Sequence, residues 1–175
     1  EYREYFPATS FDGIAAFGGS FVSENIEDYY FTPWDIDYGR LIRFDHDFVG
    51  RSALEEMSNR SHKKKVSLVI NTEDVTNIYS SQMTLGQNGK AMEMPAAHYA
   101  AYPYDTILNK QGDMVGISTY SAFLAPDGAW VGLAIVDESQ STEGNELTIV
   151  WGEPDGGSNR PPVERHVQME LRSTV

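Results

Sequence analysis

The sequence contains no cysteine among its 175 residues. Without a thiolate, this stretch cannot form a disulfide, a cysteine-ligated zinc site, an iron–sulfur cluster or a cysteine nucleophile. Small secreted domains often depend on disulfides, so the absence also argues against a secreted module. No apolar run approaches the roughly 18 residues that a membrane-spanning helix requires. We therefore expect a soluble, cytoplasmic chain with no membrane partner.

Positive charge is also scarce. The chain has 13 Lys and Arg residues against 26 Asp and Glu residues, which gives a formal net charge of -13. Proteins that bind nucleic acid neutralise its phosphates with Lys and Arg, so this balance argues against a nucleic-acid partner. The same field disfavours adhesion to anionic membranes. Beyond these exclusions, negative charge is chiefly a solubility feature.

A length of 175 residues suits one domain, or one domain with part of another. Because the chain begins at Glu1 rather than at methionine, we expect it to continue a longer reading frame. The first 31 residues are rich in glycine and large aromatic side chains, which is unlike a disordered tail. We expect upstream domains of the same chain, or a second copy in a homodimer, to cover this apolar surface.

Two helix starts are visible in the first third of the chain. Thr32 can cap free backbone N–H groups and Pro33 suits the first helical position, and Gly39 would then allow a sharp exit. Residues 40–44 follow as a candidate strand. A second helix is predicted from Ser52, which has capping-box spacing to a glutamate three residues later.

From Lys65 onward, the apolar pattern changes to that of β-strands. Residues 66–70 alternate between apolar and polar side chains, and a helix start follows at Thr72. The closing segment 163–175 alternates most clearly, which predicts one buried face with the even-numbered polar residues outside. Further candidate strands are 102–108, 114–120, 130–136 and 146–151.

These elements predict an α+β chain. Several short strands with only two helices indicate a small antiparallel barrel or sandwich, which we place at residues 62–175. Residues 1–61 then finish a preceding α+β domain.

Few polar clusters suggest catalysis. Asp45-His46-Asp47 contains metal-ligand types, but neighbouring strand residues point to opposite faces and no second cluster adds ligands. We therefore expect a polar turn and no metal. Ser20 lacks the second glycine of a nucleophile elbow, which argues against a hydrolytic triad.

An aromatic and acidic cluster is a stronger candidate. Flat apolar faces beside carboxylate acceptors suit a flat heterocycle with amide and amino donors, such as a pterin. The alternative, which the residues alone favour, is that the aromatics seal an interdomain interface while the carboxylates face water. The cluster comprises Tyr29, Tyr30, Phe31, Trp34 and Tyr38 with Glu27, Asp28, Asp35 and Asp37.

The segments Thr32–Arg40 and Phe48–Leu54 resemble the Thr-Pro-x-Glu-x-Gly-x-Gly and Phe-Ile-Gly-Arg-x-Ala-Leu segments of glycine-cleavage T-proteins, the aminomethyltransferase family. Gly112–Tyr120 looks like that family's Gly-x-x-Val-Gly-x-x-Thr-Ser element, and Pro161–Val175 resembles the closing strand of its C-terminal barrel. Finer features resemble the branch of tetrahydrofolate-dependent vanillate, syringate and 3-O-methylgallate O-demethylases. They are Gly18–Ser23, Ile26–Asp35, Phe44–Phe48 and Leu147–Glu153.

The resemblance implies three domains around a channel that binds tetrahydrofolate. Residues 1–61 would be the C-terminal end of the central folate-binding domain, and 62–175 the C-terminal barrel. In the demethylases a methyl group leaves an aryl ether oxygen of a small-molecule donor and arrives on N5 of the folate. The family's catalytic residues lie upstream, so we assign none here. The best folate-contact candidates are Trp34, Tyr38 and Tyr120, the last replacing the serine of the family element.

Two alternatives remain open. An aminomethyltransferase of the glycine-cleavage type would share the architecture and the cofactor. A free-standing, non-catalytic β-barrel module would instead use the aromatic patch to recognise a carbohydrate or a protein.

Overall fold

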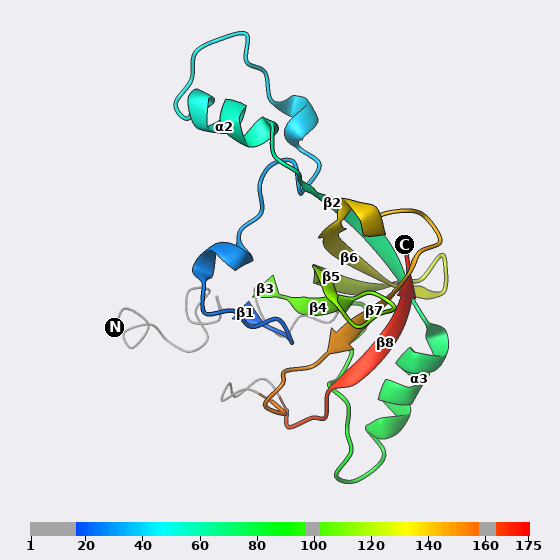
Figure 1. The fold of residues 1–175 in the computed structure, drawn as a ribbon. Coiled ribbons are helices and arrows are strands. Elements are labelled where there is room, and N and C mark those ends of the chain that lie inside the picture. Colours follow the sequence, from blue (N-terminus) through cyan, green and yellow to red (C-terminus); the bar gives the residue numbers. More distant parts are fainter. Residues whose placement is uncertain (1–16, 97–101, 158–163) are drawn as a thin grey trace.

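The computed structural model describes residues 17–96, 102–157 and 164–175. Within these residues, six antiparallel strands close into a barrel in the order β2-β6-β5-β4-β7-β8 (Figure 1). The predicted α+β class with a small antiparallel barrel is therefore confirmed. The barrel strands are β2 (Lys63–Ile70), β4 (Asp105–Leu108), β5 (Met114–Leu124), β6 (Ala129–Asp137), β7 (Glu146–Trp151) and β8 (Met169–Thr174).

The remaining elements are short. They are the α-helices α2 (Arg51–Ser58) and α3 (Thr72–Ser81), the paired parallel strands β1 (Phe17–Gly18) and β3 (Tyr102–Pro103), and the 3-10 helices η2 (Ile26–Tyr29), η3 (Gly39–Leu41) and η4 (Glu138–Gln140). In the part of the chain that the structure describes, no helix has the length and apolar character needed to cross a membrane.

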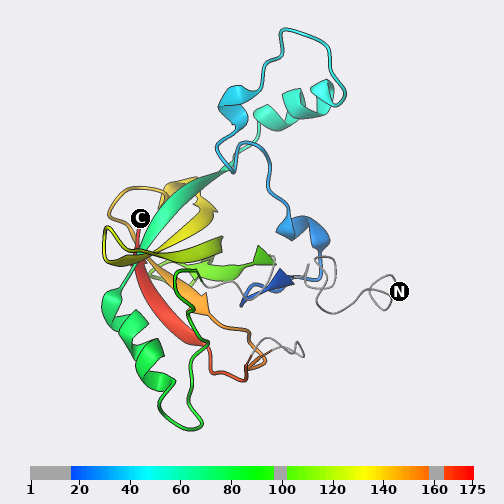
Figure 2. The same cartoon turned by 180° about the vertical axis from the view of Figure 1, so that it is seen from behind.

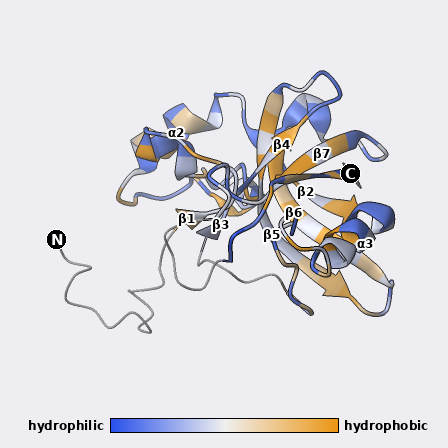
Figure 3. Cartoon of the chain, turned by 90° about the horizontal axis from the view of Figure 1, so that it is seen from below, coloured by the Kyte–Doolittle hydropathy of each residue, from blue (hydrophilic) through white to orange (hydrophobic). Residues whose placement is uncertain are grey.

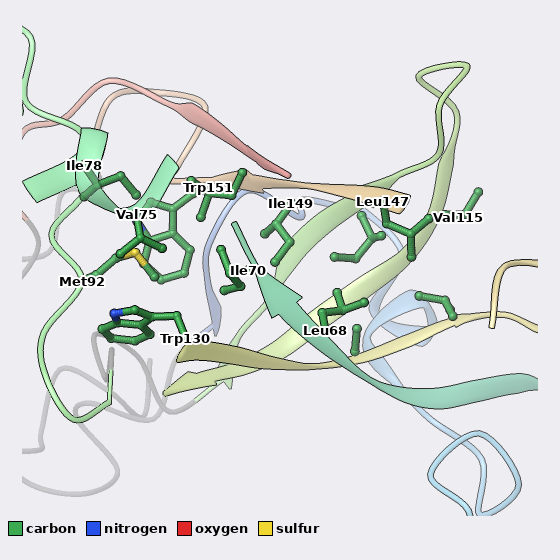
Figure 4. Packing of buried hydrophobic residues seen from close by; sticks show 14 residues of the cluster. Leu68, Ile70, Val75, Ile78, Met92, Val115, Trp130, Leu147, Ile149 and Trp151 are labelled. Atoms are coloured by element: carbon green, nitrogen blue, oxygen red, sulfur yellow. The ribbon is translucent and has the colours of Figure 1, made fainter. Parts of the chain in front are cut away.

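The barrel core forms because apolar and polar residues alternate along the strands. In β2, Leu68 and Ile70 are buried while Ser67 and Val69 are exposed, so every second side chain points inward. Figure 4 shows core side chains from several strands pointing toward one another, and Figure 3 shows apolar residues gathered on the barrel strands. The core comprises Leu68, Ile70, Val75, Ile78, Met92, Ile107, Val115, Trp130, Ala134, Val136, Leu147, Ile149, Trp151 and Leu171.

Helix α3 adds two of these core residues to the barrel. Val75 and Ile78 are three positions apart, lie on one face of the helix and are both buried. The helix begins at Thr72, as predicted, but its cap is the residue before. The side-chain oxygen of Asn71 accepts two backbone N–H groups of the first turn.

The closing strand is shorter than the predicted segment 163–175, whose first residue lies outside the described residues. In β8, Leu171 and Ser173 are buried, as the alternation predicts. The pattern also predicts His166 on the polar face, and this is wrong because the residue is buried. His166 precedes the regular strand, and its ring packs so closely on Gly152 that a Cβ there would lie 2.8 Å from it.

Residues 32–62, which we call the arm, stand away from the barrel in the two opposite views of Figure 1 and Figure 2. The structure describes the whole arm, and Asp35 is its one buried residue. Residues 17–31 instead pack on the barrel. There, β1 pairs with β3, and Phe21 is buried in a small second core with Tyr104.

The helix predicted at Thr32 is a single turn. Asp35 Oδ2 accepts the Thr32 N–H at 2.8 Å, and Thr32 Oγ1 accepts the Asp35 N–H at 3.3 Å, as in a capping box. Asp37 then adopts a left-handed conformation with φ of 68°, which ends the turn. Gly39 does not supply that exit. It lies against Trp34, where an added Cβ would be 2.2 Å from Cδ1 of the indole.

The rest of the arm differs from its prediction for related reasons. Residues 40–44 start in η3 and continue without regular structure, because a strand needs a partner for its N–H and C=O groups and no described strand lies beside them. Helix α2 is capped by Gly50, at a φ of 89°, so the predicted capping role of Ser52 is wrong. Glu55 accepts a hydrogen bond from Arg51 Nε at 2.9 Å instead.

Candidate functional site

A cavity of about 790 Å³ opens where the arm meets the barrel. This volume lies within the range of ~300–1,000 Å³ that is typical of small-molecule pockets. Its walls come from the entry to the arm, from the end of α2 through the start of β2, and from β5 and the loop after β6. The lining residues are Asp28, Tyr30, Phe31, Thr32, Asp35, Met57, Arg60, Ser61, His62, Lys63, Ile117, Asp137, Glu138 and Ser139.

Asp35 closes the arm at its base. One carboxylate oxygen accepts two hydrogen bonds from Thr32, and the other accepts the backbone N–H of Lys63 at 2.8 Å. Lys63 is the first residue of β2, so this one side chain joins the two ends of the arm. Because both oxygens are engaged, Asp35 shapes the wall of the cavity rather than offering an unused acceptor to a ligand.

His62 is the lining residue with an unmet bonding requirement. Its ring stacks on the indole of Trp34, with centroids 4.9 Å apart and planes at 12°. Its Nε2 atom is buried and has no hydrogen-bond partner among the described residues. A buried nitrogen without a partner is costly, and this atom is closed to solvent, so the ring would have to turn before a ligand in the cavity could bond to it. Trp34 itself does not line the cavity; it fixes the ring that does.

Charged groups of both signs line the same walls. Arg60 forms an ion pair with Glu56, and Glu138 Oε1 lies 3.5 Å from Lys64 Nζ. Phe31 adds a flat aromatic side chain. The cavity can therefore offer an aromatic surface, carboxylate acceptors and cationic donors to one ligand.

A metal has no comparable support. Within the described ranges, no group of three or more His, Cys, Asp or Glu residues could hold a metal ion. Asp45 and His46 are exposed and contact each other at 2.9 Å, while Asp47 accepts from Arg51 at 3.1 Å. These three residues therefore lie in a polar loop of the arm.

The other two predicted contact residues lie apart from the cavity lining. Tyr38 follows Trp34 in the same turn, is 56% exposed, and has Lys65 Nζ 6.0 Å from its ring centroid. Tyr120 lies half-buried on β5, opposite Leu133 at a shift in strand register. The structure thus brings Trp34 and Tyr38 together and puts Tyr120 on the barrel wall. Cofactor binding by all three stays a prediction.

A cluster of buried charged residues contacts residues 17–21. The sequence alone did not indicate that these charged residues come together. Lys90 Nζ donates to Glu153 Oε2 at 2.6 Å, and the two side chains are only 1% and 8% exposed. Asp105 and His166 are buried beside them. Burial raises the pKa of Glu153, but the hydrogen bond and the charge of Lys90 outweigh it and hold that pKa below its ordinary value.

The hydrogen bonds of His166 define its tautomer. The backbone N–H of Glu153 donates to Nε2 at 2.9 Å, so Nε2 acts as an acceptor and carries no proton. Nδ1 lies 2.9 Å from the carbonyl oxygen of Glu164, which requires the proton on Nδ1. In this neutral form the 3.2 Å approach of Glu153 Oε2 to Nε2 joins two acceptors and is not an ion pair.

No family profile matches this chain. Syringate O-demethylase of Sphingobium sp. (strain NBRC 103272 / SYK-6) is 39% identical over 175 residues, which is 100% of this chain and 38% of that protein. Sesamin methylene transferase of Sinomonas sp. (strain No.22) is 29% identical over 143 residues, which is 76% of this chain and 31% of that protein.

One solved structure resembles this chain in fold. The glycine cleavage system aminomethyltransferase T from Bartonella henselae matches with a TM-score of 0.50 at 14% identity, over 83% of this chain and 30% of that one. The strand order of the barrel and this structural match together show that the chain has the antiparallel barrel of the T-protein fold. The sequence match to syringate O-demethylase also extends along all 175 residues of this chain. The chain therefore belongs to a T-protein-like family, as its sequence segments predict.

Proposed function

We propose that the full-length protein is a tetrahydrofolate-dependent one-carbon transferase that moves a methyl group from a methoxylated aromatic acid to tetrahydrofolate. The observation that carries this proposal is the 39% identity to syringate O-demethylase along all 175 residues. Likeness of fold alone would not carry it, because one fold hosts many activities. The chain spans 38% of that relative, so the activity belongs to the longer protein.

The cavity beside the arm fits a folate in chemistry and in size. A pterin presents amide and amino donors that suit carboxylate acceptors, and a folate tail carries carboxylates that suit Arg60. The His62 ring adds a further lining side chain. When bound, tetrahydrofolate supplies N5 as the methyl acceptor, and the proton that N5 gives up balances the phenolate that leaves.

Residues of this chain would bind and orient the folate rather than carry out the chemical step. Asp35 and Trp34 fix the turn and the His62 ring, and the cavity walls exclude water from one side of the ligand. Cofactor binding by Trp34, Tyr38 and Tyr120 stays our prediction. None of the three lines this cavity, and Trp34 stacks on the lining residue His62. We assign no catalytic residue to this chain.

Residues 1–61 would belong to the central folate-binding domain, and residues 62–175 would form the barrel domain. The exposed apolar side chains of the arm, such as Leu41 and Val49, support this because an isolated arm leaves them in water. Upstream parts of the same chain would cover them. A cytoplasmic location also stays our prediction, and it rests on the cysteine-free composition.

The test uses the full-length protein with tetrahydrofolate and, in turn, vanillate, syringate and 3-O-methylgallate. Mass spectrometry would follow 5-methyltetrahydrofolate and the freed phenol together. Equal amounts of both products support demethylation and identify the best donor. If folate binds but neither product forms, demethylation is wrong. If folate does not bind, the cofactor proposal fails as well.

A pair of histidine variants tests the cavity. His62→Ala removes a ring that lines the cavity, and we expect roughly tenfold weaker folate binding from the loss of its contacts with the ligand. His46→Ala is the matched control, because it removes an exposed ring from the same arm. Isothermal titration calorimetry measures both. Equal affinities for the two variants would remove the cavity from the proposal.

A second one-carbon reaction has its own support. The likeness to sesamin methylene transferase covers 76% of this chain at 29% identity. A methylene donor would yield 5,10-methylenetetrahydrofolate rather than the 5-methyl product. The same mass measurement, repeated with a methylenedioxy-aromatic donor and with an aminomethyl donor, separates these reactions from demethylation.

A further inference from the structure

Residues 17–21 are bound to the barrel by two buried carboxylates. The Gly19 N–H donates to Glu153 Oε1 at 3.1 Å, and the Ser20 N–H donates to Asp105 Oδ1 at 3.0 Å. The Ser20 hydroxyl in turn accepts the N–H of Thr106 at 2.8 Å. Hydrogen bonds from backbone N–H groups to a carboxylate are stronger than neutral ones, especially away from water. This short segment is therefore held by its backbone and not by its side chains alone.

Gly19 is the residue that permits this approach. Its φ of 93° lies in the left-handed region, which residues with a side chain rarely adopt. A Cβ at this position would lie 2.1 Å from the Tyr104 carbonyl oxygen and 2.9 Å from Asp105 Oδ1. The chain thus passes close enough to present consecutive N–H groups to the two carboxylates.

Lys90 supplies the positive charge for these carboxylates. It lies on the segment after α3, donates to Glu153 and is attracted by Asp105. Its backbone carbonyl accepts the Trp151 indole N–H at 2.9 Å, which fixes the lysine backbone to the core. Burial lowers the pKa of Lys90, and the carboxylates oppose that shift. Removing one member of such a buried group leaves an uncompensated charge.

A continuous set of ring contacts links residues 17–21 to the cavity. Tyr29 packs against Phe17 with ring centroids 4.4 Å apart and against Phe21 at 5.0 Å. Phe31 meets Tyr104 edge-on at 5.6 Å. Phe31 is also a lining residue of the cavity. The position of that wall therefore depends on where residues 17–21 are seated.

We propose that Lys90, Glu153 and Asp105 form a buried ionic latch that seats residues 17–21 on the barrel and so positions the cavity wall that Tyr30 and Phe31 form. These three are positioning residues, because they act through the aromatic segment and do not touch the cavity. The proposal rests on the proposed function only for the identity of the ligand.

Hydrogen–deuterium exchange on the full-length protein tests the latch without relying on turnover. The main variant is Lys90→Met, which keeps the length of the side chain and removes its charge. Lys110→Met is the matched control, because Lys110 also pairs with a glutamate, at 2.7 Å, but on the surface. We expect at least tenfold faster exchange in peptides covering 17–31 for Lys90→Met and no change there for Lys110→Met. Unchanged exchange over 17–31 in Lys90→Met would overturn the proposal.

Two further variants distinguish a local effect on residues 17–31 from a general loss of folding. Asp105→Asn keeps an acceptor oxygen for Ser20 but removes the charge, so we expect a smaller, still local rise in exchange over residues 17–31. Lys90→Met/Glu153→Gln removes both members of the ion pair, and we expect it to regain part of the protection lost in Lys90→Met. If Asp105→Asn and the double variant loosen β7 and β8 as much as residues 17–31, the cluster supports the core and the latch is wrong.

Folate affinity provides the functional readout. In Lys90→Met we expect a raised KM for folate with a smaller change in kcat, and partial recovery in the double variant. If the wild type makes no methylated folate but exchange follows the predicted pattern, the latch stands and the proposed function fails. If turnover is normal while residues 17–31 stay protected in every variant, the function stands and the latch fails.

Discussion

The barrel and the arm bury different kinds of residues. Among the described barrel residues, apolar side chains from every strand fill one core, and Leu68, Ile149 and Leu171 are fully buried. In the arm, the one buried side chain is the carboxylate of Asp35. The barrel is therefore stabilised by apolar burial, whereas the arm depends on a few hydrogen bonds and on ring contacts such as the stack of Trp34 on His62.

Charge does not separate the two regions. Residues 32–62 hold four of the 13 Lys and Arg residues together with six Asp and Glu residues, and residues 63–175 also have more Asp and Glu than Lys and Arg. Several of these cations form ion pairs within the arm, such as Arg51 with Glu55. Exposed pairs of this kind add little stability. The comparison teaches that the arm has no apolar core of its own, since it buries one carboxylate and leaves apolar side chains such as Leu41 and Val49 exposed.

The largest expected effect is on the barrel core. Leu171→Ala removes a fully buried side chain and should lower the free energy of unfolding by about 2–5 kcal/mol. Leu41→Ala removes the same atoms from an arm residue that is 68% exposed, and should change the free energy of unfolding by less than about 0.5 kcal/mol. Urea denaturation of the 175-residue chain measures both. Equal losses would mean that the arm shares the stability of the core.

The next effect concerns the hydrogen bonds by which Asp74 of α3 holds Arg172 of β8. Asp74 accepts the backbone N–H of Arg172 at 2.8 Å and its Nε at 2.9 Å. Asp74→Asn should cost about 1–2 kcal/mol at neutral pH. Thermal unfolding of the variant and the wild type at pH 7 measures this loss.

The pH dependence of that loss follows from the pKa of Asp74. The hydrogen bonds from Arg172 lower the pKa of this carboxyl in the folded state, although partial burial opposes them. The unfolded state then binds the proton at higher pH, so this stability is present above about pH 4 and is lost as the pH falls further. The gap between wild type and Asp74→Asn should therefore narrow at pH 3. If the difference in stability between wild type and Asp74→Asn were the same at pH 3 and pH 7, the ion pair would be excluded as its cause.

A smaller effect is expected at the stacked rings of Trp34 and His62. Trp34→Ala removes the partner of His62 and should weaken the local structure by about 0.5–1.5 kcal/mol. Hydrogen exchange should rise over residues 32–39 while the unfolding midpoint of the barrel stays the same. Tyr38→Ala is the control from the same turn, and we expect a weaker response because its ring is exposed. A shifted barrel midpoint in Trp34→Ala would contradict the separation of the two regions.

The smallest effect belongs to the surface pairs of the arm. Arg40 Nη2 lies 3.7 Å from Asp37 Oδ2, and both side chains are mostly exposed. We expect Arg40→Ala to leave the unfolding curve unchanged within measurement error, at low salt and at high salt. A clear loss at low salt would show that the arm relies on its charges more than its geometry indicates.

Sequence alone predicted the barrel because strand alternation is a local property. The period of two over residues 66–70 and 146–151 identifies buried positions without any knowledge of the partner strands. Local signals were less reliable in the arm. Residues 40–44 have the composition of a strand, yet no strand in the described part of the chain lies beside them for pairing.

The candidate site divides in the same way. Sequence alone determined the barrel, the aromatic segment at residues 29–38 and the family resemblance, because composition and short motifs carry that information. Only the tertiary structure assigned His62 to a cavity and buried Lys90 beside Glu153, which lies 63 residues further along the chain. A lysine in a sequence is expected to face water, since burying its charge is costly. Partners distant in the chain offset that cost, and only the folded barrel brings them together.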